Sequence, residues 1–403
     1  MKHLLNALGA SALALSAGAA CAQANPYYIG LSQTFSHEDN LIRLREGQSA
    51  PAGLSKSDTV SSTALVAGID QTFGRQRLSG NATLRSNRYQ DNPDFNSQGY
   101  SVAGGLQWQT IERLSGSVRL NADRALRADL RDRSDNFIPG NNSETATSLD
   151  LAAALGVAGP WALEAGASWR KVTYSAAAAQ FREYETQAAN AGVRWRPGAS
   201  LTLGLGLGRS TIDYPNLLLA ANPKDRRVTD SVNLTSTWVP SGASSLNVRV
   251  SRNQTEYEQF SARDFSATSG AVSWTWRPTA RLRMTSALAR DIGQDSDTAT
   301  TAFSRTTDSF NLQLNYEVSA KVTAALGFNA YRRDVDGTGF FVTGISGRDS
   351  GDGTSLTLRW EALRSLSLGC TLSHERRRAN TNPLLNDVYS AGAVSCFGQF
   401  TLQ

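Results

Sequence analysis

Beyond its first 24 residues, this chain of 403 residues contains only two His and two Cys. A metal site needs His, Cys or carboxylate ligands clustered at defined spacing, and His37, His374, Cys370 and Cys396 form no such set. The sequence also lacks a glycine-rich nucleotide-binding loop. We therefore expect no metal, no cofactor and no enzymatic activity.

Strong charge of one sign is absent as well. Forty basic against 35 acidic residues give a net charge of +5, which does not indicate nucleic acid as a partner. Two acidic stretches, Asp91–Asp94 and Asp129–Asp135, lack the pattern of an EF-hand loop. We interpret both as solvated loops, with weak calcium binding as the alternative.

Long apolar runs are missing from residue 25 onward, where none approaches the ~20 residues of a membrane-spanning helix. Residues 1–24 have a basic start and a short apolar stretch, and they end on Ala22-Gln23-Ala24. This pattern predicts a secretory signal peptide. The exported chain, residues 25–403, is then either soluble or a membrane β-barrel.

The sequence does contain a period of two. Residues Leu201, Leu203, Leu205 and Leu207 alternate with Thr and Gly, and this spacing puts apolar side chains on one face of a strand. No stretch of comparable length has a helical period, so we predict an all-β chain. The same alternation occurs in 114–120, 149–157, 161–169, 232–238, 246–251, 272–276, 310–316, 322–330, 356–360 and 366–372.

Two kinds of connection separate these segments. The short ones are Gly74-Arg75-Gln76, Thr110–Glu112, Gly159-Pro160, Pro197–Ser200, Pro240–Ala243, Pro278–Ala280, Val318–Ala320 and Glu361–Ser365. The long polar ones are 40–58, 90–97, 127–142, 175–185, 213–226, 255–263, 290–304, 334–352 and 376–386. Short periplasmic turns that alternate with long extracellular loops are typical of outer-membrane barrels. We predict a transmembrane antiparallel up-and-down β-barrel of about 18 strands, with both termini on the short-turn side.

Aromatic residues stand beside the short connections, on the apolar face of their strands. Aromatic belts mark the interface between membrane and water. We therefore predict a periplasmic girdle made of Phe73, Trp108, Trp161, Trp195, Trp238, Trp276, Tyr316 and Trp360.

A secreted soluble β-sandwich, solenoid or propeller is the alternative fold. Its inward core usually needs larger and more varied side chains than the Leu, Val, Ala and Gly of this apolar face. The last strand supports a barrel, because Val394, Cys396, Gly398, Phe400 and Leu402 share one face. Such an amphipathic end with an aromatic residue suits the barrel-insertion machinery.

The polar face of the strands carries arginines. A charge on the lipid face near mid-bilayer would cost ~2–4 kcal/mol, so we expect these side chains to line the lumen: Arg85, Arg119, Arg170, Arg194, Arg249, Arg283 and Arg359. Two interpretations stay open, a basic track for an anionic or polyhydroxylated solute and internal ion pairs that brace the wall. Some pairing is expected, since the acidic residues Asp70, Asp123, Asp150 and Glu164 have the same parity. We place Arg113 and Arg281, beside turns, at the periplasmic rim.

The remaining reactive residues lie near strand ends. Ser36 and Glu38 flank His37 and supply the residue types of a Ser–His–acid arrangement, but a solvated loop is the simpler interpretation. Cys370 and Cys396 would stand opposite one another if their hairpin is centred near Pro383. Cross-strand geometry and export both permit a disulfide, and two free thiols are the alternative.

Several stretches resemble one family. SHEDNLIRL, SDTVSSTALVAGIDQTFGRQRLSG and RLSGSVRLNADRAL resemble the EpsL-type outer-membrane proteins of exopolysaccharide loci, and the ending FTLQ is similar too. These loci accompany the exosortase/PEP-CTERM system in Gram-negative bacteria. The resemblance implies a β-barrel porin that helps to secrete or assemble an extracellular polysaccharide, without catalytic residues.

The sequence therefore predicts an outer-membrane channel whose substrate is a polysaccharide. Its other expected partners are outer-membrane lipid and lipopolysaccharide, the barrel-insertion machinery and polysaccharide export components. A general diffusion porin for small solutes, a non-conducting structural barrel and an outer-membrane hydrolase are the alternatives.

Overall fold

The computed structural model describes residues 25–110, 113–127, 138, 140–156, 159–216, 225–258, 264–298, 301–339, 343–379 and 388–402. The predicted signal peptide, residues 1–24, and the acidic stretch Asp129–Asp135 lie outside the described residues. Among the described residues, no helix is long and apolar enough to cross a membrane.

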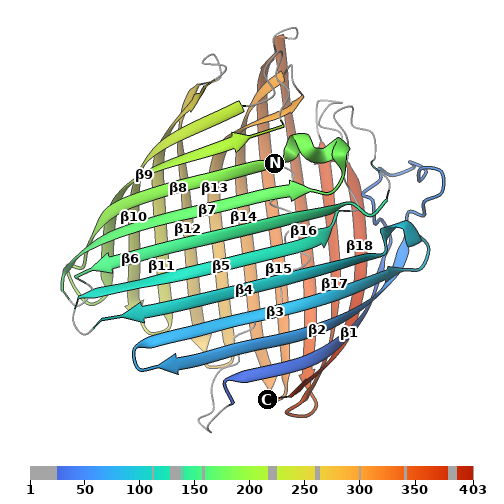
Figure 1. Cartoon of the computed structure of the whole chain (residues 1–403), viewed down its shortest axis with the longest axis horizontal. Coiled ribbons are helices and arrows are strands. Elements are labelled where there is room, and N and C mark those ends of the chain that lie inside the picture. The colour runs from blue at the N-terminus through green and yellow to red at the C-terminus, as the bar shows by residue number, and fades with distance from the viewer. Residues whose placement is uncertain are drawn as a thin grey trace.

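The described chain folds into one antiparallel sheet of eighteen strands that closes on itself. Each strand pairs with its neighbours in sequence, and β1 also pairs with β18, so the predicted fold class is confirmed. The strands are β1 (Tyr27–Glu38), β2 (Asp58–Phe73), β3 (Gln76–Tyr89), β4 (Ser97–Gln109), β5 (Leu114–Leu126), β6 (Ser143–Leu155), β7 (Trp161–Tyr174), β8 (Tyr184–Trp195), β9 (Leu201–Tyr214), β10 (Asp225–Ser241), β11 (Ser244–Tyr257), β12 (Phe265–Thr279), β13 (Leu282–Thr298), β14 (Thr301–Ser319), β15 (Val322–Gly339), β16 (Thr343–Glu361), β17 (Leu366–Ala379) and β18 (Tyr389–Leu402). Figure 1 shows β2–β8 crossing the near wall obliquely, with β10–β17 behind them.

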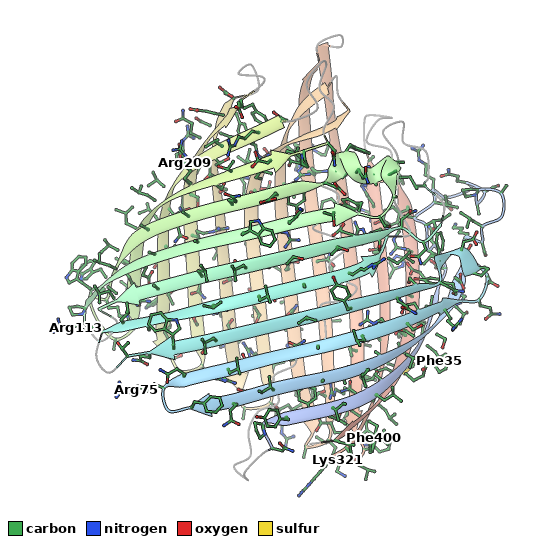
Figure 2. The ribbon with its side chains drawn as sticks, viewed as in Figure 1. Phe35, Arg75, Arg113, Arg209, Lys321 and Phe400 are labelled. Carbon is green, nitrogen blue, oxygen red and sulfur yellow. A yellow bond between two sulfur atoms is a disulfide. The ribbon has the colours of Figure 1, made fainter. Side chains whose placement is uncertain are left out.

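The register keeps the alternating apolar residues of neighbouring strands on the outside of the wall. Leu205 pairs with Leu234, and Leu31 pairs with both Leu65 and Phe400, so the apolar parity continues from strand to strand. These five side chains are exposed. Figure 2 shows Phe35 and Phe400 standing off the outside of the barrel. The exposed apolar surface is the opposite of a soluble fold, which buries such residues.

The apolar exterior forms a band of limited height. On β14 the outward residues are apolar from Tyr316 to Phe310, and the next one is Asp308. From Tyr316 to Asp308 the strand rises about 27 Å, or about 20 Å along the barrel axis at a tilt of about 40°. That height is close to the apolar band of about 25 Å that outer-membrane barrels present to lipid.

The connections alternate between the two ends of the barrel as predicted. The short turns gather at one end, where Arg75, Arg113 and Lys321 lie in Figure 2. Ile29 pairs with Leu402, so β1 begins and β18 ends at this same end. The position of Arg113 and of Arg281, which lies in the turn between β12 and β13, agrees with their prediction at the rim.

The prediction of a long polar loop is wrong in two places. Residues 290–304 and 334–352 were expected as polar loops, but most of them extend the hairpins β13–β14 and β15–β16, which rise above the rim in Figure 1. These stretches lack an apolar alternation because they lie beyond the apolar band. Thr is frequent among residues 298–307, and this β-branched residue favours strands even without a buried face.

The two clusters of buried apolar residues among the described residues sit at the long-loop end. One cluster joins Leu41, Ile42 and Leu44 to Phe95, and the other joins Val172, Tyr174 and Ala179. Two short 3-10 helices belong to these clusters, η2 (Pro93–Phe95) and η3 (Ala177–Arg182). Compact packing is thus confined to the mouth of the barrel.

Candidate channel lumen and outer mouth

The inside of the barrel is wet along much of its height. Arg119, Asn121, Asp150 and Thr235 have the inward parity of their strands, yet their side chains are exposed. An inward side chain is exposed inside a closed wall only where other side chains do not fill the interior. At this level the lumen is therefore an aqueous space, as expected for a wall of eighteen strands.

The seven predicted arginines all have inward parity but differ in their partners. Arg194 forms an ion pair of 2.8 Å with Glu164, and Arg359 lies 3.9 Å from Glu361. Within the described part of the chain, no ion pair within 4 Å and no hydrogen bond involves the other five side chains: Arg85, Arg119, Arg170, Arg249 and Arg283, all exposed. They also lie at different heights, from beside a turn (Arg283) to near the outer end (Arg170). Two of the seven arginines are therefore ion-paired with other residues of the wall, and five face the lumen without such a pair among the residues described.

The four acidic residues predicted to face inward also differ in whether they form ion pairs. Asp70 accepts a hydrogen bond of 2.7 Å from Arg77 Nε, a partner that the sequence analysis did not name. Glu164 is the partner of Arg194. Asp150 stands directly opposite Arg119 in the register, without an ion pair within 4 Å. The charged inward residues of β2–β8 thus form a sector of mixed sign, which includes Asp123.

The opposite sector, β9–β12, is nearly neutral inside. Between the outer-end residues Asp225 and Arg227 and the turns, Arg249 is the one charged inward side chain among its described residues. Hydroxyl and amide groups, with Gly and Ala between them, occupy most of the rest, and several of them bond across the strands. Ser251 donates to Asn233 Oδ1 at 2.6 Å, Asn253 Nδ2 to Ser269 Oγ at 3.1 Å, Thr237 to Asn247 Oδ1 at 2.8 Å, and the hydroxyls of Thr229 and Thr255 lie 3.0 Å apart.

Small residues in this neutral sector project little into the lumen. Inward glycines such as Gly204, Gly206 and Gly208 carry no side chain, so the wall recedes along β9. A Cβ on Gly204 would lie 2.3 Å from the Thr235 hydroxyl, and one on Gly208 would lie 2.8 Å from the Ser231 hydroxyl. These hydroxyl groups therefore cover the glycine backbone and present a continuous polar surface to the lumen.

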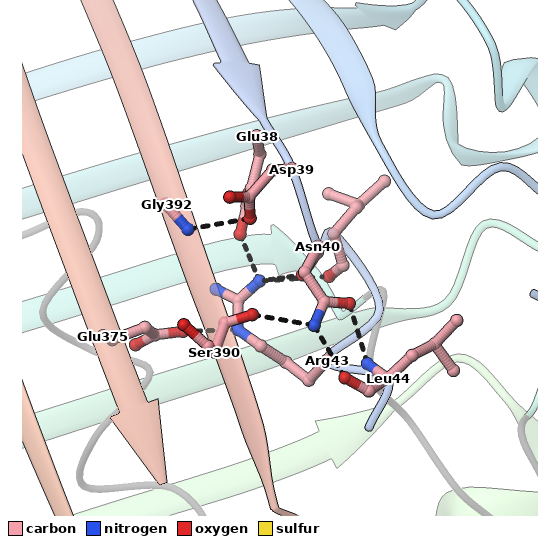
Figure 3. A network of polar contacts seen from close by, with 9 residues as sticks. Glu38, Asp39, Asn40, Arg43, Leu44, Glu375, Ser390 and Gly392 are labelled. Carbon is pink, nitrogen blue, oxygen red and sulfur yellow. Dashed lines mark hydrogen bonds and ion pairs between the residues drawn. The ribbon is translucent and has the colours of Figure 1, made fainter. Parts of the chain in front are cut away.

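At the outer mouth, the loop after β1 folds against the inside of the wall (Figure 3). The guanidinium of Arg43 bonds Glu38 on β1 and pairs with Glu375 on β17, and it stacks over the Tyr389 ring of β18 at 5.8 Å. Burial disfavours the Arg43 cation, but the two carboxylates outweigh this effect and raise its pKa. Arg43 thus stays charged and ties the loop to the first and last strands.

Asn40 completes this attachment. Its side-chain Nδ2 donates to the carbonyl oxygens of Leu44 (2.7 Å) and Ser390 (3.0 Å), and its Oδ1 accepts from the Leu44 backbone N–H at 2.8 Å. Asn40 is buried, so each bond replaces water that the group has lost. Leu41, Ile42 and Leu44 then pack on Phe95 and fix the loop over this side of the lumen.

Two further elements narrow the mouth. The Asp58 carboxylate is buried and accepts hydrogen bonds from the backbone N–H groups of Gln90, Asp91 and Asn92. Asp91 and Asp94 themselves are exposed, so this acidic stretch is solvated as predicted. Across the mouth, η3 packs its Ala179 on the inward side chains Val172 and Tyr174.

Asp349 forms a buried ionic cluster on the inner face of β15–β17. Its Oδ1 accepts from Arg333 Nε at 2.7 Å, and its Oδ2 accepts from Arg377 Nε at 3.0 Å and from Arg377 Nη2 at 2.7 Å. Tyr331 covers Gly351 beside them. Neither this cluster nor the role of Arg43 was predicted from the sequence. The sequence does contain a signal for the docking of the Arg43 loop, because Leu41, Ile42 and Leu44 form an apolar group inside a loop predicted to be polar.

The eight aromatic residues predicted as a girdle all face outward beside the short turns. Trp161 pairs with Trp195 in the register, and their rings stack with centroids 5.5 Å apart. Trp276 stacks on Trp274 at 5.3 Å, while Trp108 lies over Gly116. These aromatic side chains stand on strands from β2 to β16, and they mark where the interface with the periplasmic side of a membrane would lie.

Cys370 and Cys396 stand opposite each other on β17 and β18, as predicted, and they form a disulfide. His37 faces outward and contacts the Thr59 hydroxyl at 3.0 Å, while Ser36 and Glu38 point to the other face of β1. The three residues therefore do not converge as a Ser–His–acid arrangement requires. The described residues contain no cluster of three or more potential metal ligands.

The wall of the barrel is closed, apolar on the outside and hydrated on the inside. This is the architecture of a channel-like β-barrel of the outer membrane. No protein-family model matches the chain, and no curated protein is significantly similar to it in sequence.

Solved structures of outer-membrane proteins are similar to the chain at low identity. OccK3 (OpdO) of Pseudomonas aeruginosa is 11% identical, with a TM-score of 0.47 over 93% of this chain and 95% of that one. OccK2 (OpdF) of the same organism, solved in complex with glucuronate, is 13% identical, with a TM-score of 0.47 over 94% and 97%. The siderophore receptor PirA of Acinetobacter baumannii is 8% identical, with a TM-score of 0.47 over 93% and 80%.

Proposed function

We propose that this protein is a passive outer-membrane channel through which an extracellular polysaccharide leaves the cell. The single observation that carries the proposal is the inner surface of β9–β12, where hydroxyl and amide side chains replace charges over most of the strand length. Energy for export would come from elsewhere, because the sequence has no nucleotide-binding loop.

The chemistry of this surface suits a chain of sugars. Hydroxyl groups of a sugar both donate and accept hydrogen bonds, and so do Ser, Thr, Asn and Gln side chains. The side chains of Asn233 and Asn253 bond to Ser251 and Ser269, which holds each amide in place, and both amides are partly exposed with further donors and acceptors for the lumen. Many weak, equivalent contacts let a polymer enter and also leave.

The mixed-charge sector of β2–β8 supports an acidic or partly charged glycan as well as a neutral one. Arg85, Arg119 and Arg170 face the lumen without an ion pair, so they can attract uronate or other acidic groups. The resemblance of SHEDNLIRL and RLSGSVRLNADRAL to EpsL-type proteins supports the same substrate class and an association with an exosortase system. On this proposal residues 1–24 direct export, and the barrel-insertion machinery and polysaccharide export components are the partners.

Planar-bilayer recording with the purified protein tests the proposal. We expect a steady conductance that falls when the extracellular polymer of the source cells, or a size-matched neutral glucan, is added to one side. Conductance that small sugars cross and that no polymer blocks would instead identify a general diffusion porin. Absence of conductance would identify a structural barrel.

A pair of variants sharpens this test. Asn233→Ala with Asn253→Ala removes two amides of the neutral sector, and we expect the polymer to block less at each concentration. The matched control, Asn81→Ala with Asn121→Ala, removes two inward amides from the charged sector and should leave the block by a neutral glucan unchanged. An equal effect of both pairs would contradict the assignment of the track to β9–β12.

A further inference from the structure

Four exposed arginines gather on the outer face of β15–β17, just beyond the apolar band. Arg332, Arg348, Arg376 and Arg378 are each about half exposed, with side-chain exposures of 53%, 48%, 46% and 48%. The register places them together, since Ser350 pairs with both Arg332 and Arg378. We call these four side chains the outer arginine cluster.

This cluster has too few acids to neutralise it. Asp334 lies between Arg332 (3.5 Å) and Arg348 (2.5 Å), and Asp352 lies between Arg376 (3.3 Å) and Arg378 (3.2 Å). Four arginines thus share two aspartates, and the next acid, Asp308, stands opposite Arg332 in the register but is already bonded by Arg290. Within the described residues of these strands, neither the ion pairs nor the hydrogen bonds add a further acid to the four arginines.

Three other outward arginines at the same level each have an aspartate of their own. Arg209 pairs with Asp230 at 3.2 Å, Arg226 with Asp213 at 3.3 Å, and Arg290 with Asp308 through two hydrogen bonds of 2.6 and 2.7 Å. Arg88 on β3 and Arg252 on β11 also face outward without an acid of the described chain within 4 Å, but each stands singly. The gathering of four arginines around two aspartates is what distinguishes β15–β17.

Apolar side chains lie directly below the cluster. On β17 the outward residues from the turn are Leu366, Leu368, Cys370 and Leu372, followed by His374 and then by Arg376 and Arg378. On β16, Leu358 and Leu356 precede Asp352 in the same direction. The surface is thus cationic at the top and apolar underneath, which matches a molecule with an anionic head and hydrocarbon chains.

The wall behind the cluster is rigid. The buried carboxylate of Asp349 joins Arg333 of β15 to Arg377 of β17 across the inner face of the same three strands. This clamp fixes the spacing of the strands that carry the outer arginines, so little freedom is lost when a ligand binds.

We propose that the outer arginine cluster binds the phosphate groups of a phosphorylated glycolipid of the outer leaflet, with the acyl chains along Leu356, Leu358 and Leu372. Guanidinium groups bind phosphate in a bidentate manner and are less strongly hydrated than ammonium groups. Each shared aspartate occupies only part of its two guanidinium groups, and the N–H donors that remain are available to phosphate. The inference depends on the outer-membrane location of the barrel and is independent of the exported polysaccharide.

Binding of lipid A to the purified full-length protein in detergent tests this proposal. We expect bis-phosphorylated lipid A to bind at least about tenfold more tightly than the same lipid without phosphates. The double variant Arg376→Gln with Arg378→Gln should lose most of this preference. The control, Arg209→Gln with Arg226→Gln, removes two outward arginines that each have an aspartate of their own and should keep it.

Three results would overturn the proposal: equal binding of both lipids, an Arg376→Gln/Arg378→Gln variant that binds like the wild type, and displacement of the bound lipid by an equimolar amount of inorganic phosphate. Heat-modifiable mobility in gels establishes that each variant is folded. Conductance and its block by polymer should be the same in all variants, so a failure here is distinguishable from a failure of the channel proposal.

Discussion

Cys370 and Cys396 occupy the same register position of the last hairpin, with Cα atoms 4.1 Å apart, and their bond crosses the outer face of the wall. The bond closes a loop whose ends are separated by 26 positions in sequence. It joins the two strands that precede the closing contact between β18 and β1. Exported proteins keep such bonds, because their compartment is oxidising.

Reduction of this disulfide should destabilise the barrel. For a loop of this length the chain-entropy model gives about 3.5 kcal/mol, as an upper value. We expect a lower guanidinium midpoint for the reduced wild type than for the oxidised one in vesicles. The variant Cys370→Ala/Cys396→Ala should unfold at one midpoint with and without reductant, and a wild type that does not respond to reductant would contradict the prediction.

Leu234 and Thr235 are neighbours on β10 that face opposite sides of the wall. Leu234→Arg places a charge in the apolar band and should lower the free energy of unfolding by about 2–4 kcal/mol. Thr235→Arg places the same side chain in the hydrated lumen, and we expect a change below about 1 kcal/mol. Guanidinium titration in lipid vesicles measures both, and equal losses would show that the two faces are not lipid and water.

Arg249 is the isolated charge of the neutral sector, so its removal should change ion selectivity. At about 7 Å through water a unit charge contributes about 0.6 kcal/mol. The charge favours an anion and disfavours a cation by this amount, so Arg249→Gln should reduce the permeability ratio of anions to cations by about sevenfold at low salt. Reversal potentials in a salt gradient give this ratio. Arg209→Gln, which changes an arginine on the outer face, should leave it unchanged.

Arg43→Ala should loosen the loop 39–57 without unfolding the barrel. The substitution leaves Glu38 and Glu375 without their cation at a partly buried site, and loss of one partner from a buried pair costs about 3–5 kcal/mol. Hydrogen exchange of the amides of residues 41–44 should accelerate at least tenfold. Arg45→Ala removes an exposed arginine of the same loop and serves as the control. Similar exchange in both variants would contradict the role given to Arg43.

The strands and their outward faces could be predicted because apolar and polar residues alternate with a period of two within each segment. Leu201 to Leu207 carry it on β9, and the position of Pro383 between Cys370 and Cys396 was enough to place the two cysteines opposite each other. The upper parts of β13–β16 were missed because both faces of these hairpins lie beyond the apolar band. No difference between the faces then remains in the sequence.

The contacts at the mouth of the channel could not be predicted from the sequence, for a different reason. The contacts of Asn40 with Ser390 and of Arg43 with Glu375 join residues that lie more than 300 positions apart. Nothing in the loop sequence specifies which distant strand will stand beside it, because that depends on barrel closure. The neutral character of β9–β12 was also not predicted, because Ser, Thr and Asn alternate with apolar residues in many strands and only the closed barrel shows that four neighbouring strands share this inner surface.

The attachment of Arg43 has a consequence for how the barrel is made. Its partners belong to the first strand and to the last two, so the loop can dock only after β18 has met β1. The loop thus joins the strands on both sides of the seam where the barrel closes. A docked loop 39–57 therefore indicates a molecule in which insertion has been completed.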